Sequence, residues 1–586
     1  MRDYNEKKTL QLGICIALIL NLIVFGSFSF ILFRIIPDYQ YPFYPYGETL
    51  KVARTSNPLT MDPVDSWDSA SNDMLDQVLE TLLAYDLSDP DLPLVGRLAE
   101  SWYWADNRTI VFQLRENVFF HDGSRFTADC VLYTIKRIGY FGNWSGTLPS
   151  TERMALPHSL YKFRDGTPIF NDTLSFATDD YNVTLVLNRP YSPAEGLLTY
   201  TASSIVSNIS TPMDKMLDKS SDLVIGTGPF KLIRYIPNQE VRFARWERYW
   251  RTGPYWDYIV YVYYPSAINT NNAMLAGDID YLGQGIESFK HDFEIYPYIT
   301  ITGDGVHDYI NGSTYWYVGF NTEIINQTWR KAMLYALNYT NVIEVLKQNM
   351  VYKANSLVPP GFLGHNASGV GGTYNIPKAR QIMQSMGFGY TDGVPWDVGA
   401  QIGDQFIPGA NETLWLTAEF IPMEGTFTDN NFNFHYYPSY FMTLFMDQFN
   451  NDMHLIGIKA AEPVHRFQWI IPPSPEELHI FFAGWSPEYI ETFNMIEPLV
   501  DPESPSNIGK INNTEINALL EITTAELNTS RRHEYYKKLQ YLIHDKYYYQ
   551  MPLFYDKIYY VHASSLKGFP YNFLIDLYFY PTYRGF

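Results

Sequence analysis

The stretch FFHDGSRFTADC, at residues 119–130, carries the side chains of nucleophilic and metal chemistry. His121 beside Asp122 could be two members of a catalytic triad, and Cys130 could be a nucleophile. Neighbouring residues of a strand point to opposite faces, however, so this histidine and aspartate do not readily orient one another. The Asp-Gly pair is typical of a turn, and Thr127 is placed to begin a helix with Cys130 in its first turn. We therefore interpret the stretch as a strand end, a turn and a helix start.

Motifs that would hold a metal or a nucleotide do not occur in the sequence. The 12 histidines form neither an HxH nor an HExxH pattern, and there is no P-loop or GxGxxG turn. Cys130 is the only cysteine beyond Cys15, so the main body of the chain cannot form an intramolecular disulfide or a cysteine zinc site. We expect no cofactor and no enzyme activity, although a hydrolase that uses His121 remains an alternative.

A group of carboxylates lies near the strand-like segment HIFFAGW at residues 479–485. Glu476 and Glu477 precede this segment, and Glu488 and Glu491 follow it. Most acidic side chains are solvated, but ligands of α/β proteins bind at the carboxyl ends of strands. Glu488 comes directly after such an end, so it is the carboxylate that we expect to contact a ligand.

Size, composition and charge restrict the function further. A chain of 586 residues exceeds a single core, which predicts two or more lobes. The hydrophobic fraction of 46% supplies enough apolar side chains to fill them. The formal net charge of −21 argues against a nucleic-acid partner, because phosphates require a basic surface.

The N-terminal region predicts a membrane anchor. An apolar run from Thr9 to Phe33 is long enough to cross the ~30 Å hydrocarbon core of a bilayer as a helix. The run is longer than the apolar part of a cleavable signal peptide, although a removed signal peptide remains an alternative. We expect a short cytoplasmic N-terminus at residues 1–8, a single-pass anchor in the cell membrane at 9–35, a Pro/Tyr-rich spacer at 36–48, and an extracellular body.

Asn-x-Ser/Thr sequons support the extracellular assignment, because there are more of them than chance would place in this chain. They predict N-linked glycans on an exported surface. The twelve sequons begin at Asn107, Asn143, Asn171, Asn182, Asn208, Asn311, Asn326, Asn338, Asn366, Asn411, Asn512 and Asn528.

Strands and helices alternate along the chain. Residues 49–54 read as a strand, and apolar residues at helical spacing over 68–86 predict a helix with Asp68 among its candidate caps. A later helix is expected at 340–349 with Thr340 as its cap. Strands that alternate with helices over two long halves predict α/β lobes.

Five further segments occur in the order of one family's signatures. They read LTMDPVDSWDSASNDMLDQVLETLLAYD, LAESWYWADNRTIVFQLRENVFFHDGSRFTADCVLYTIKRI, GTGPFKLIRY, WRKAMLYALNYTNVI and AGWSPEY. Together they resemble the extracytoplasmic solute-binding proteins of family 5, the peptide/nickel/oligopeptide-binding type that serves ATP-binding-cassette (ABC) importers. The resemblance runs from about Leu50 to near the C-terminus, and its most specific block is at residues 98–138.

The resemblance implies a periplasmic-binding-protein-like α/β fold of the cluster C type. Such a fold has two lobes and a small extra domain, and it encloses its ligand by a hinge motion. The implied parts are a discontinuous lobe I at 49–86, 225–314 and 551–586, an extra domain at 87–224, and a lobe II at 315–550.

The resemblance also implies where a ligand binds. In peptide-binding relatives, an acidic residue shortly after a Gly-Trp pair holds the ammonium of the peptide, and the matching residue here is Glu488 in GWSPEY. Relatives usually carry Asp at this position, so the charge is kept while the reach is one methylene longer. Trp485, Tyr489, Trp67 and Asp68 fall near positions that wall the pocket in the family.

We therefore predict a membrane-anchored extracellular receptor that captures di- or oligopeptides and delivers them to the permease and ATPase subunits of an ABC importer. Two alternatives remain open. An oligosaccharide-binding receptor of the same family would use the abundant Trp and Tyr residues for stacking on sugar rings. A structural surface-layer glycoprotein would need only the anchor and the sequons.

Overall fold

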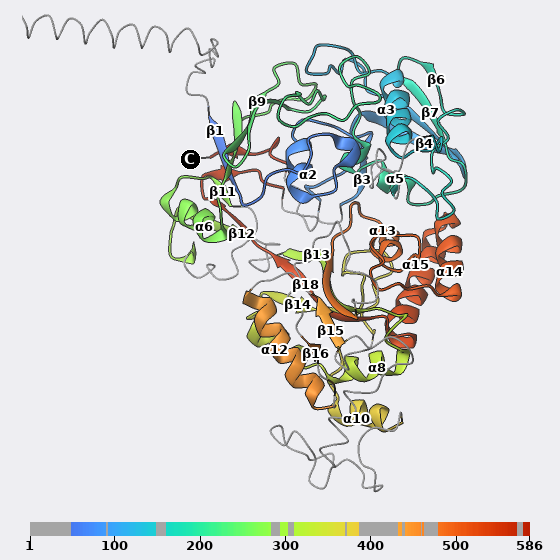
Figure 1. The fold of residues 1–586 in the computed structure, drawn as a ribbon. Coiled ribbons are helices and arrows are strands. Elements are labelled where there is room, and N and C mark those ends of the chain that lie inside the picture. The colour runs from blue at the N-terminus through green and yellow to red at the C-terminus, as the bar shows by residue number, and fades with distance from the viewer. Residues whose placement is uncertain are drawn as a thin grey trace, which may run out of the picture. The chain divides into compact units, whose positions relative to one another are not determined.

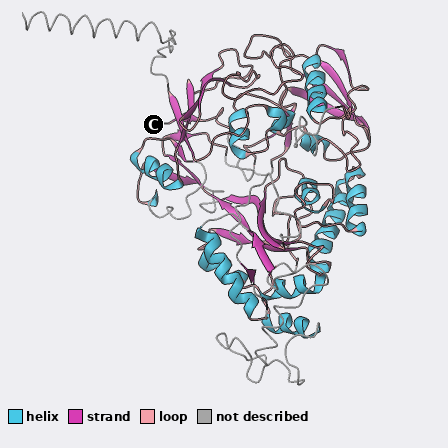
Figure 2. Ribbon diagram, viewed as in Figure 1, coloured by secondary structure: helices cyan, strands magenta, loops and turns pink. Residues whose placement is uncertain are grey.

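Two mixed β-sheets, built from strands that are far apart in the sequence, organise the chain (Figure 1, Figure 2). Both sheets lie within residues 49–586, which form one compact unit. The computed structural model describes residues 48–89, 92–147, 160–282, 293–302, 310–369, 372–385, 432–435, 440–456, 458, 460–461, 479–570 and 578–585.

The first sheet has seven strands in the order β12-β19-β11-β1-β10-β9-β8. As the sequence predicts, β1 is a strand, and it pairs in parallel with both β10 and β11. Alternate residues of its strands, such as Leu50, Val52 and Ile259, are buried in one core. We refer to this sheet and the regions packed on it as the first lobe. The strands are β1 (Thr49–Arg54), β8 (Phe230–Ile236), β9 (Glu240–Arg245), β10 (Tyr258–Tyr263), β11 (Tyr281–Leu282), β12 (Ile299–Thr302) and β19 (Tyr560–Ala563).

The second sheet has six strands in the order β14-β18-β13-β17-β15-β16 and forms the centre of the second lobe. Successive residues of a strand face opposite sides of a sheet. Accordingly, Tyr315 and Tyr317 of β13 lie in one buried cluster, while Val318 and Phe320 lie in another. The strands are β13 (Ile310–Phe320), β14 (Val351–Lys353), β15 (Phe432–His435), β16 (Ala460–Ala461), β17 (Ile480–Trp485) and β18 (Gln550–Ile558).

Helices cover both faces of the second sheet, which explains why its strands are apolar on both sides. The helices α8 (Gln327–Ala336), α10 (Ile376–Ser385) and α12 (Tyr440–His454) share the cluster that contains Val318. The helices α13 (Thr492–Val500), α14 (Thr514–Ala525) and α15 (Thr529–Gln540) share the cluster that contains Tyr315 and lie together in Figure 1.

A four-stranded antiparallel sheet in the order β4-β5-β7-β6 forms the extra region, with α3 packed on it. Its buried side chains belong to the same cluster as α13, α14 and α15, so this region packs against the second lobe. The elements are β4 (Ala99–Asp106), β5 (Thr109–Leu114), α3 (Ala128–Phe141), β6 (Phe176–Asp179) and β7 (Asn182–Val186).

The shorter elements connect these layers. They are η1 (Pro63–Asp65), α2 (Ser69–Leu75), β2 (Leu83–Tyr85), β3 (Leu94–Gly96), α5 (Ala194–Leu197), η2 (Thr201–Ser203), α6 (Ala267–Ala276), α9 (Tyr339–Asn341), the π-helices η3 (Val342–Leu346) and η4 (Tyr541–Lys546), β20 (Leu566–Lys567) and β21 (Tyr583–Arg584).

The chain passes from the first sheet to the second between β12 and β13, and it returns between β18 and β19. The strands β13 and β18 are antiparallel neighbours, so both passages lie beside one another at the same pair of strands. The family resemblance implies a return to lobe I at residue 551. The pairing shows instead that the strand from Gln550 to Ile558 belongs to the second sheet and that the first sheet resumes at Tyr560.

The helix expected over residues 68–86 is much shorter than predicted. It has the expected cap, Asp68, but ends at Leu75. The carbonyl oxygens of Gln77 and Val78 accept hydrogen bonds from the amides of Phe230 and Gly228 instead of continuing the helix. Apolar spacing alone did not reveal this competing tertiary pairing.

The helix expected at 340–349 also differs from the prediction. Its N-cap is Asn338, whose side chain accepts a hydrogen bond from the amide of Asn341 at 3.1 Å, and not Thr340. One turn of α9 then continues as the π-helix η3. Within the described part of the chain, no helix is both long and apolar enough to span a membrane. The anchor expected at residues 9–35 lies outside the described residues.

Candidate ligand-binding site

A cavity of about 500 Å³ lies between the two lobes. The first lobe contributes Arg54 at the end of β1, Asp73 and Asp76 in and after α2, and Arg97 after β3. The second lobe contributes residues of the loop after β17, together with Trp316 of β13 and Asp556 of β18. Residues with carboxylate and guanidinium groups therefore line one cavity, which suits a small ligand that carries charges.

Arg54 and Asp73 form an ion pair on the first-lobe side of the cavity, with side chains only 12% and 13% exposed. The guanidinium of Arg54 also lies over the ring of Tyr261, 5.5 Å from its centroid. Burial raises the pKa of Asp73 to about 6, although the charge of Arg54 opposes the shift. Burial likewise raises the pKa of Asp76 to about 7, against a hydrogen bond of 2.8 Å from the hydroxyl of Thr201.

Glu488 lines the cavity from the second lobe. Its loop is held by α13, because the backbone amide of Glu488 donates to Oδ1 of Asn494 at 2.7 Å. The residue is half-buried, but its Oε2 atom is inaccessible to solvent and has no hydrogen-bond partner among the described residues. Burial raises the pKa of Glu488 to about 7, although hydrogen bonds from its own backbone and from Asn494 oppose the shift. Glu488 thus lines the cavity with a carboxylate that has one unpaired oxygen.

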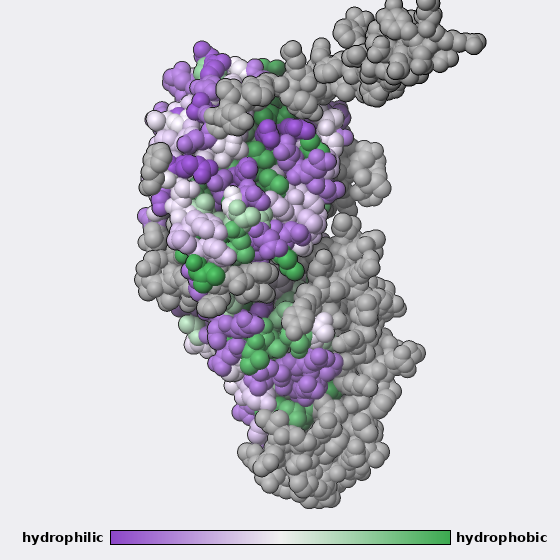
Figure 3. Space-filling model, turned by 90° about the vertical axis from the view of Figure 1, so that its left-hand side faces the viewer, coloured by the Kyte–Doolittle hydropathy of each residue, from purple (hydrophilic) through white to green (hydrophobic). Residues whose placement is uncertain are grey.

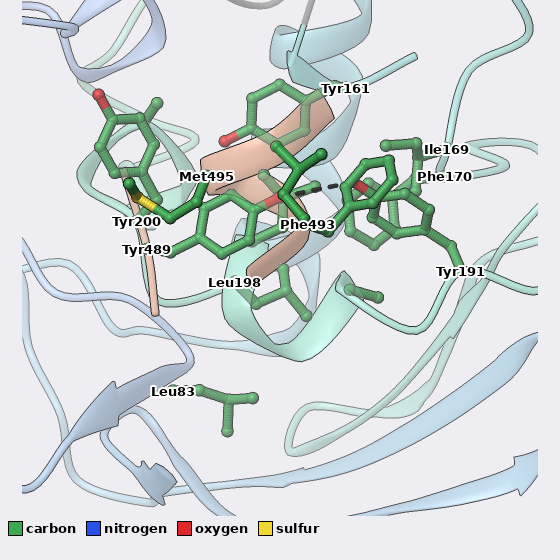
Figure 4. Close-up of a cluster of buried hydrophobic side chains, with 14 of the residues drawn as sticks. Leu83, Tyr161, Ile169, Phe170, Tyr191, Leu198, Tyr200, Tyr489, Phe493 and Met495 are labelled. Carbon is green, nitrogen blue, oxygen red and sulfur yellow. Dashed lines mark hydrogen bonds between the residues drawn. The ribbon is translucent and has the colours of Figure 1, made fainter. Parts of the chain in front are cut away.

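The two neighbours of Glu488 that the resemblance singled out lie elsewhere. Trp485 packs at the edge of the buried cluster, and its indole N–H donates to the carbonyl of Asn494 at 2.9 Å. Tyr489 is 2% exposed. Figure 4 shows Tyr489 among aromatic and aliphatic side chains of the extra region and of α13, and its hydroxyl lies 3.5 Å from that of Tyr191. Neither residue lines the cavity; both contribute to the packing around it.

Of the two first-lobe residues expected at the pocket, only Trp67 lines the cavity. Trp67 lines the cavity, and 45% of it is exposed. Asp68 is the N-cap of α2 and accepts hydrogen bonds from the amide and the hydroxyl of Ser71, so its carboxylate is used within the helix start. The structure thus brings Glu488 and Trp67 to one cavity and leaves Asp68 at its border.

Five charged residues of the cavity were not predicted from the sequence, among them Asp556 of β18. Arg54 stands at the carboxyl end of a parallel strand, where ligands of α/β proteins bind, so that signal was present in the sequence. Asp73 and Asp76 are on and just after α2, and Arg97 follows a three-residue strand. Their positions depend on the folding of distant segments against one another, and no periodicity marks them.

The stretch at residues 119–130 forms the local structure that the sequence predicts. Nε2 of His121 lies 2.9 Å from the carbonyl oxygen of Gly228, and Nδ1 accepts from the amide of Gly226 at 3.3 Å. Burial lowers the pKa of His121 to about 4. Thr127 is the N-cap of α3, and Cys130 is buried in its first turn. His121 therefore joins the extra region to the loop before β8 and does not line the cavity.

The sequon asparagines that the structure describes are exposed or half-buried, so none of them lies in a core. Asn411 lies outside the described residues. On the face drawn in Figure 3, apolar residues form separate patches among hydrophilic ones. Glycans at these sequons remain a prediction.

Comparison with known proteins gives the same family as the sequence motifs. The model for bacterial extracellular solute-binding proteins, family 5 (middle), matches residues 93–507. Heme-binding protein A of Haemophilus influenzae is 24% identical over 498 residues, which cover 80% of this chain and 80% of that protein. The dipeptide-binding protein of Escherichia coli is 26% identical over 320 residues, which cover 50% of this chain and 55% of that protein.

Solved structures share the fold. The periplasmic binding protein DppA of Helicobacter pylori, in complex with the peptide STSA, has a TM-score of 0.72 at 20% identity, and the match covers 92% of this chain and 98% of that one. The oligopeptide-binding protein AppA of Bacillus subtilis, in complex with a nonapeptide, has a TM-score of 0.70 at 17% identity, with coverage of 92% and 99%. These matches confirm the two-lobed α/β fold. The family match over residues 93–507 shows that the chain belongs to the family-5 extracellular solute-binding proteins.

Proposed function

We propose that this protein is an extracellular receptor that captures a short peptide between its two lobes and delivers it to an ABC import permease. The observation that carries the proposal is the cavity of about 500 Å³, which is lined by Glu488 from the second lobe and by the charged residues of the first lobe. Relatives whose names state a peptide ligand, among them the dipeptide-binding protein and the STSA complex, support the ligand class.

Glu488 is the proposed partner of the peptide's ammonium group. A carboxylate that is partly removed from water and lacks one hydrogen bond gains most from a cationic N–H donor, because charge-assisted hydrogen bonds are about twice as strong as neutral ones. The hydroxyl groups of Thr199, Thr314 and Ser486 lie on residues that line the same cavity and can accept or donate to the peptide backbone. Recognition of backbone and terminal charges leaves the side chains of the peptide free to vary.

The volume of the cavity favours a short peptide. Pockets for small ligands span roughly 300–1,000 Å³, and about 500 Å³ lies in the lower half of that range. We therefore favour di- and tripeptides over long oligopeptides.

Closure of the lobes on the ligand would give the permease a closed conformation to recognise. The passages between the sheets lie at the adjacent strands β13 and β18, an arrangement that allows a hinge. A ligand that contacts both lobes stabilises the closed arrangement over the open one by its differential affinity for the two. The proposed anchor at residues 9–35 would hold the receptor near the permease at a high effective concentration, and the proposed glycans would cover its extracellular surface.

Mass spectrometry of ligands that co-purify with the protein, followed by calorimetric titration, tests the proposal. Titration uses a library of di- and tripeptides, cello-oligosaccharides and haem as separate arms. Saturable heat with peptides alone is the expected result. Heat with oligosaccharides and none with any peptide would support stacking on the exposed ring of Trp67 instead, and would overturn the peptide assignment.

A further inference from the structure

We propose that Arg97 binds the carboxylate of the ligand, so that the receptor selects a short zwitterionic peptide with a free C-terminus. This inference rests on the proposed function, because it assigns the second end of the peptide whose ammonium we place at Glu488. It names a residue that neither the motifs nor the comparisons single out.

Arg97 is a guanidinium of the cavity that has no ion-pair partner among the described residues and an Nε atom without a hydrogen bond. It lies directly after β3 and lines the cavity. Its Nε atom is inaccessible to solvent and has no hydrogen-bond partner, and its guanidinium forms no ion pair with any residue that the structure describes. Arg54, the other cavity guanidinium, also has an unpartnered Nε atom, but its charge is paired with Asp73. A guanidinium in a cavity without an acceptor is costly unless a ligand supplies one.

The two carboxylates whose charges act on Arg97 already accept hydrogen bonds from other side chains. Glu80 accepts from the hydroxyl of Tyr249 at 2.8 Å, the indole of Trp250 at 2.9 Å and the hydroxyl of Thr227 at 2.9 Å. Asp76 accepts from the hydroxyl of Thr201 at 2.8 Å. Both influence Arg97 electrostatically and keep its pKa high, but their hydrogen bonds leave the N–H groups of Arg97 unused.

Tyr578 fixes the plane of the guanidinium. The ring of Tyr578 lies 4.7 Å from the guanidinium carbon of Arg97, and both residues line the cavity. A stacked aromatic ring covers the face of a guanidinium and uses none of its N–H groups, which project from the edge. A planar donor edge held in this way matches the two oxygens of a carboxylate.

The position of Arg97 relative to Glu488 explains why one ligand would bridge the lobes. Arg97 belongs to the first lobe and Glu488 to the second, and both line one cavity. A peptide with an ammonium at one end and a carboxylate at the other can pair with both residues, and each pair then holds one lobe. Loss of either charge on the ligand would weaken binding and closure together.

The test compares one peptide as its free acid and as its C-terminal amide. The probe is the peptide that binds most tightly in a library of di- and tripeptide free acids that includes Met-Leu. With the unmodified receptor, amidation is expected to weaken binding roughly 10- to 100-fold, the usual effect of losing a hydrogen-bonded charge pair. In Arg97→Gln, the free acid is expected to lose the same factor, while the affinity for the amide changes less than about 3-fold.

Controls separate this role from a structural one. Arg97→Lys keeps the charge and should restore part of the preference for the acid. Arg251→Gln removes an arginine that also stacks on an aromatic ring, 4.3 Å from Trp250, but does not line the cavity, and should leave the preference unchanged. Equal affinity of the unmodified receptor for acid and amide would overturn the inference while leaving the proposed function intact. No binding of any peptide would overturn the proposed function itself.

Discussion

Replacing Glu488 by Gln tests the centre of the proposed site, because it removes the charge and nearly keeps the shape of the side chain. A hydrogen bond to a charged group contributes roughly 1.5–3 kcal/mol, so a peptide with a free ammonium should lose about 10- to 150-fold in affinity. Its N-acetylated form has no ammonium and should lose little. Calorimetry with both peptides on both proteins gives the four affinities that are needed.

The same carboxylate predicts how affinity depends on pH. The pKa of Glu488 is raised to about 7 before a ligand binds, and an ammonium partner lowers it in the complex. Affinity is therefore full above pH 7 and falls as the pH drops, until the pKa of the complex is reached. A coupling of about 2 kcal/mol lowers the pKa to about 5.5. Affinity should then fall by a factor of roughly 12 between pH 7.5 and 5.5.

Two comparisons make this prediction refutable. Asp73 and Asp76 also have raised pKa values, so the N-acetylated peptide measures the pH dependence that they cause. Glu503→Gln removes an exposed carboxylate of the same lobe that does not line the cavity, and it should change nothing. Equal losses for the free and acetylated peptides in Glu488→Gln, or an unchanged pH dependence in that variant, would show that Glu488 does not bind the ammonium.

Three other predictions concern closure and stability. Tyr85→Phe removes a hydroxyl that accepts from the amide of Ile490 at 3.0 Å and donates to its carbonyl at 3.3 Å across the lobes. Ligand affinity should fall about 2- to 12-fold, and small-angle scattering should show a less compact liganded protein; an unchanged profile would contradict this. Asp62→Ala leaves Arg137 buried without its ion-pair partner, whose oxygens lie 2.7 and 2.5 Å from the guanidinium nitrogens. This should lower the free energy of unfolding by about 3–5 kcal/mol, measured by urea denaturation, and a loss below 1 kcal/mol would argue against it. His121→Ala should lower stability by about 1–3 kcal/mol and leave peptide affinity unchanged, whereas lost binding would reopen the case for a functional histidine.

Local chemistry explains the parts of the fold that were predicted correctly. The alternation at residues 49–54 and the turn at Asp122-Gly123 act within a few residues, so the sequence shows them directly. Asp68 caps its helix as predicted. The helix after it was predicted too long because residues 77 and 78 bond to the amides of a loop about 150 residues away, and no local pattern records such a pairing.

Some residues of the candidate site could likewise be predicted from the sequence, and others could not. Glu488 and Trp67 could be chosen from the sequence, since each stands in a family motif next to a predicted element. Trp485 and Tyr489 stand in the same motif, but α13 and the extra region take them into packing contacts. A motif shows which residues are close along the chain, and it does not show which of them face a cavity.

The sequence by itself determined the family, the α/β class and the carboxylate most worth testing, because ordered motifs and short-range periodicity carry that information. Only the tertiary structure decided what surrounds that carboxylate. Arg54, Asp73, Asp76 and Arg97 reach the cavity through strand pairing and packing between segments that lie hundreds of residues from Glu488. Burial, the absence of a hydrogen-bond partner and the resulting pKa shifts are properties of that shared space, so they appear only once the chain has folded.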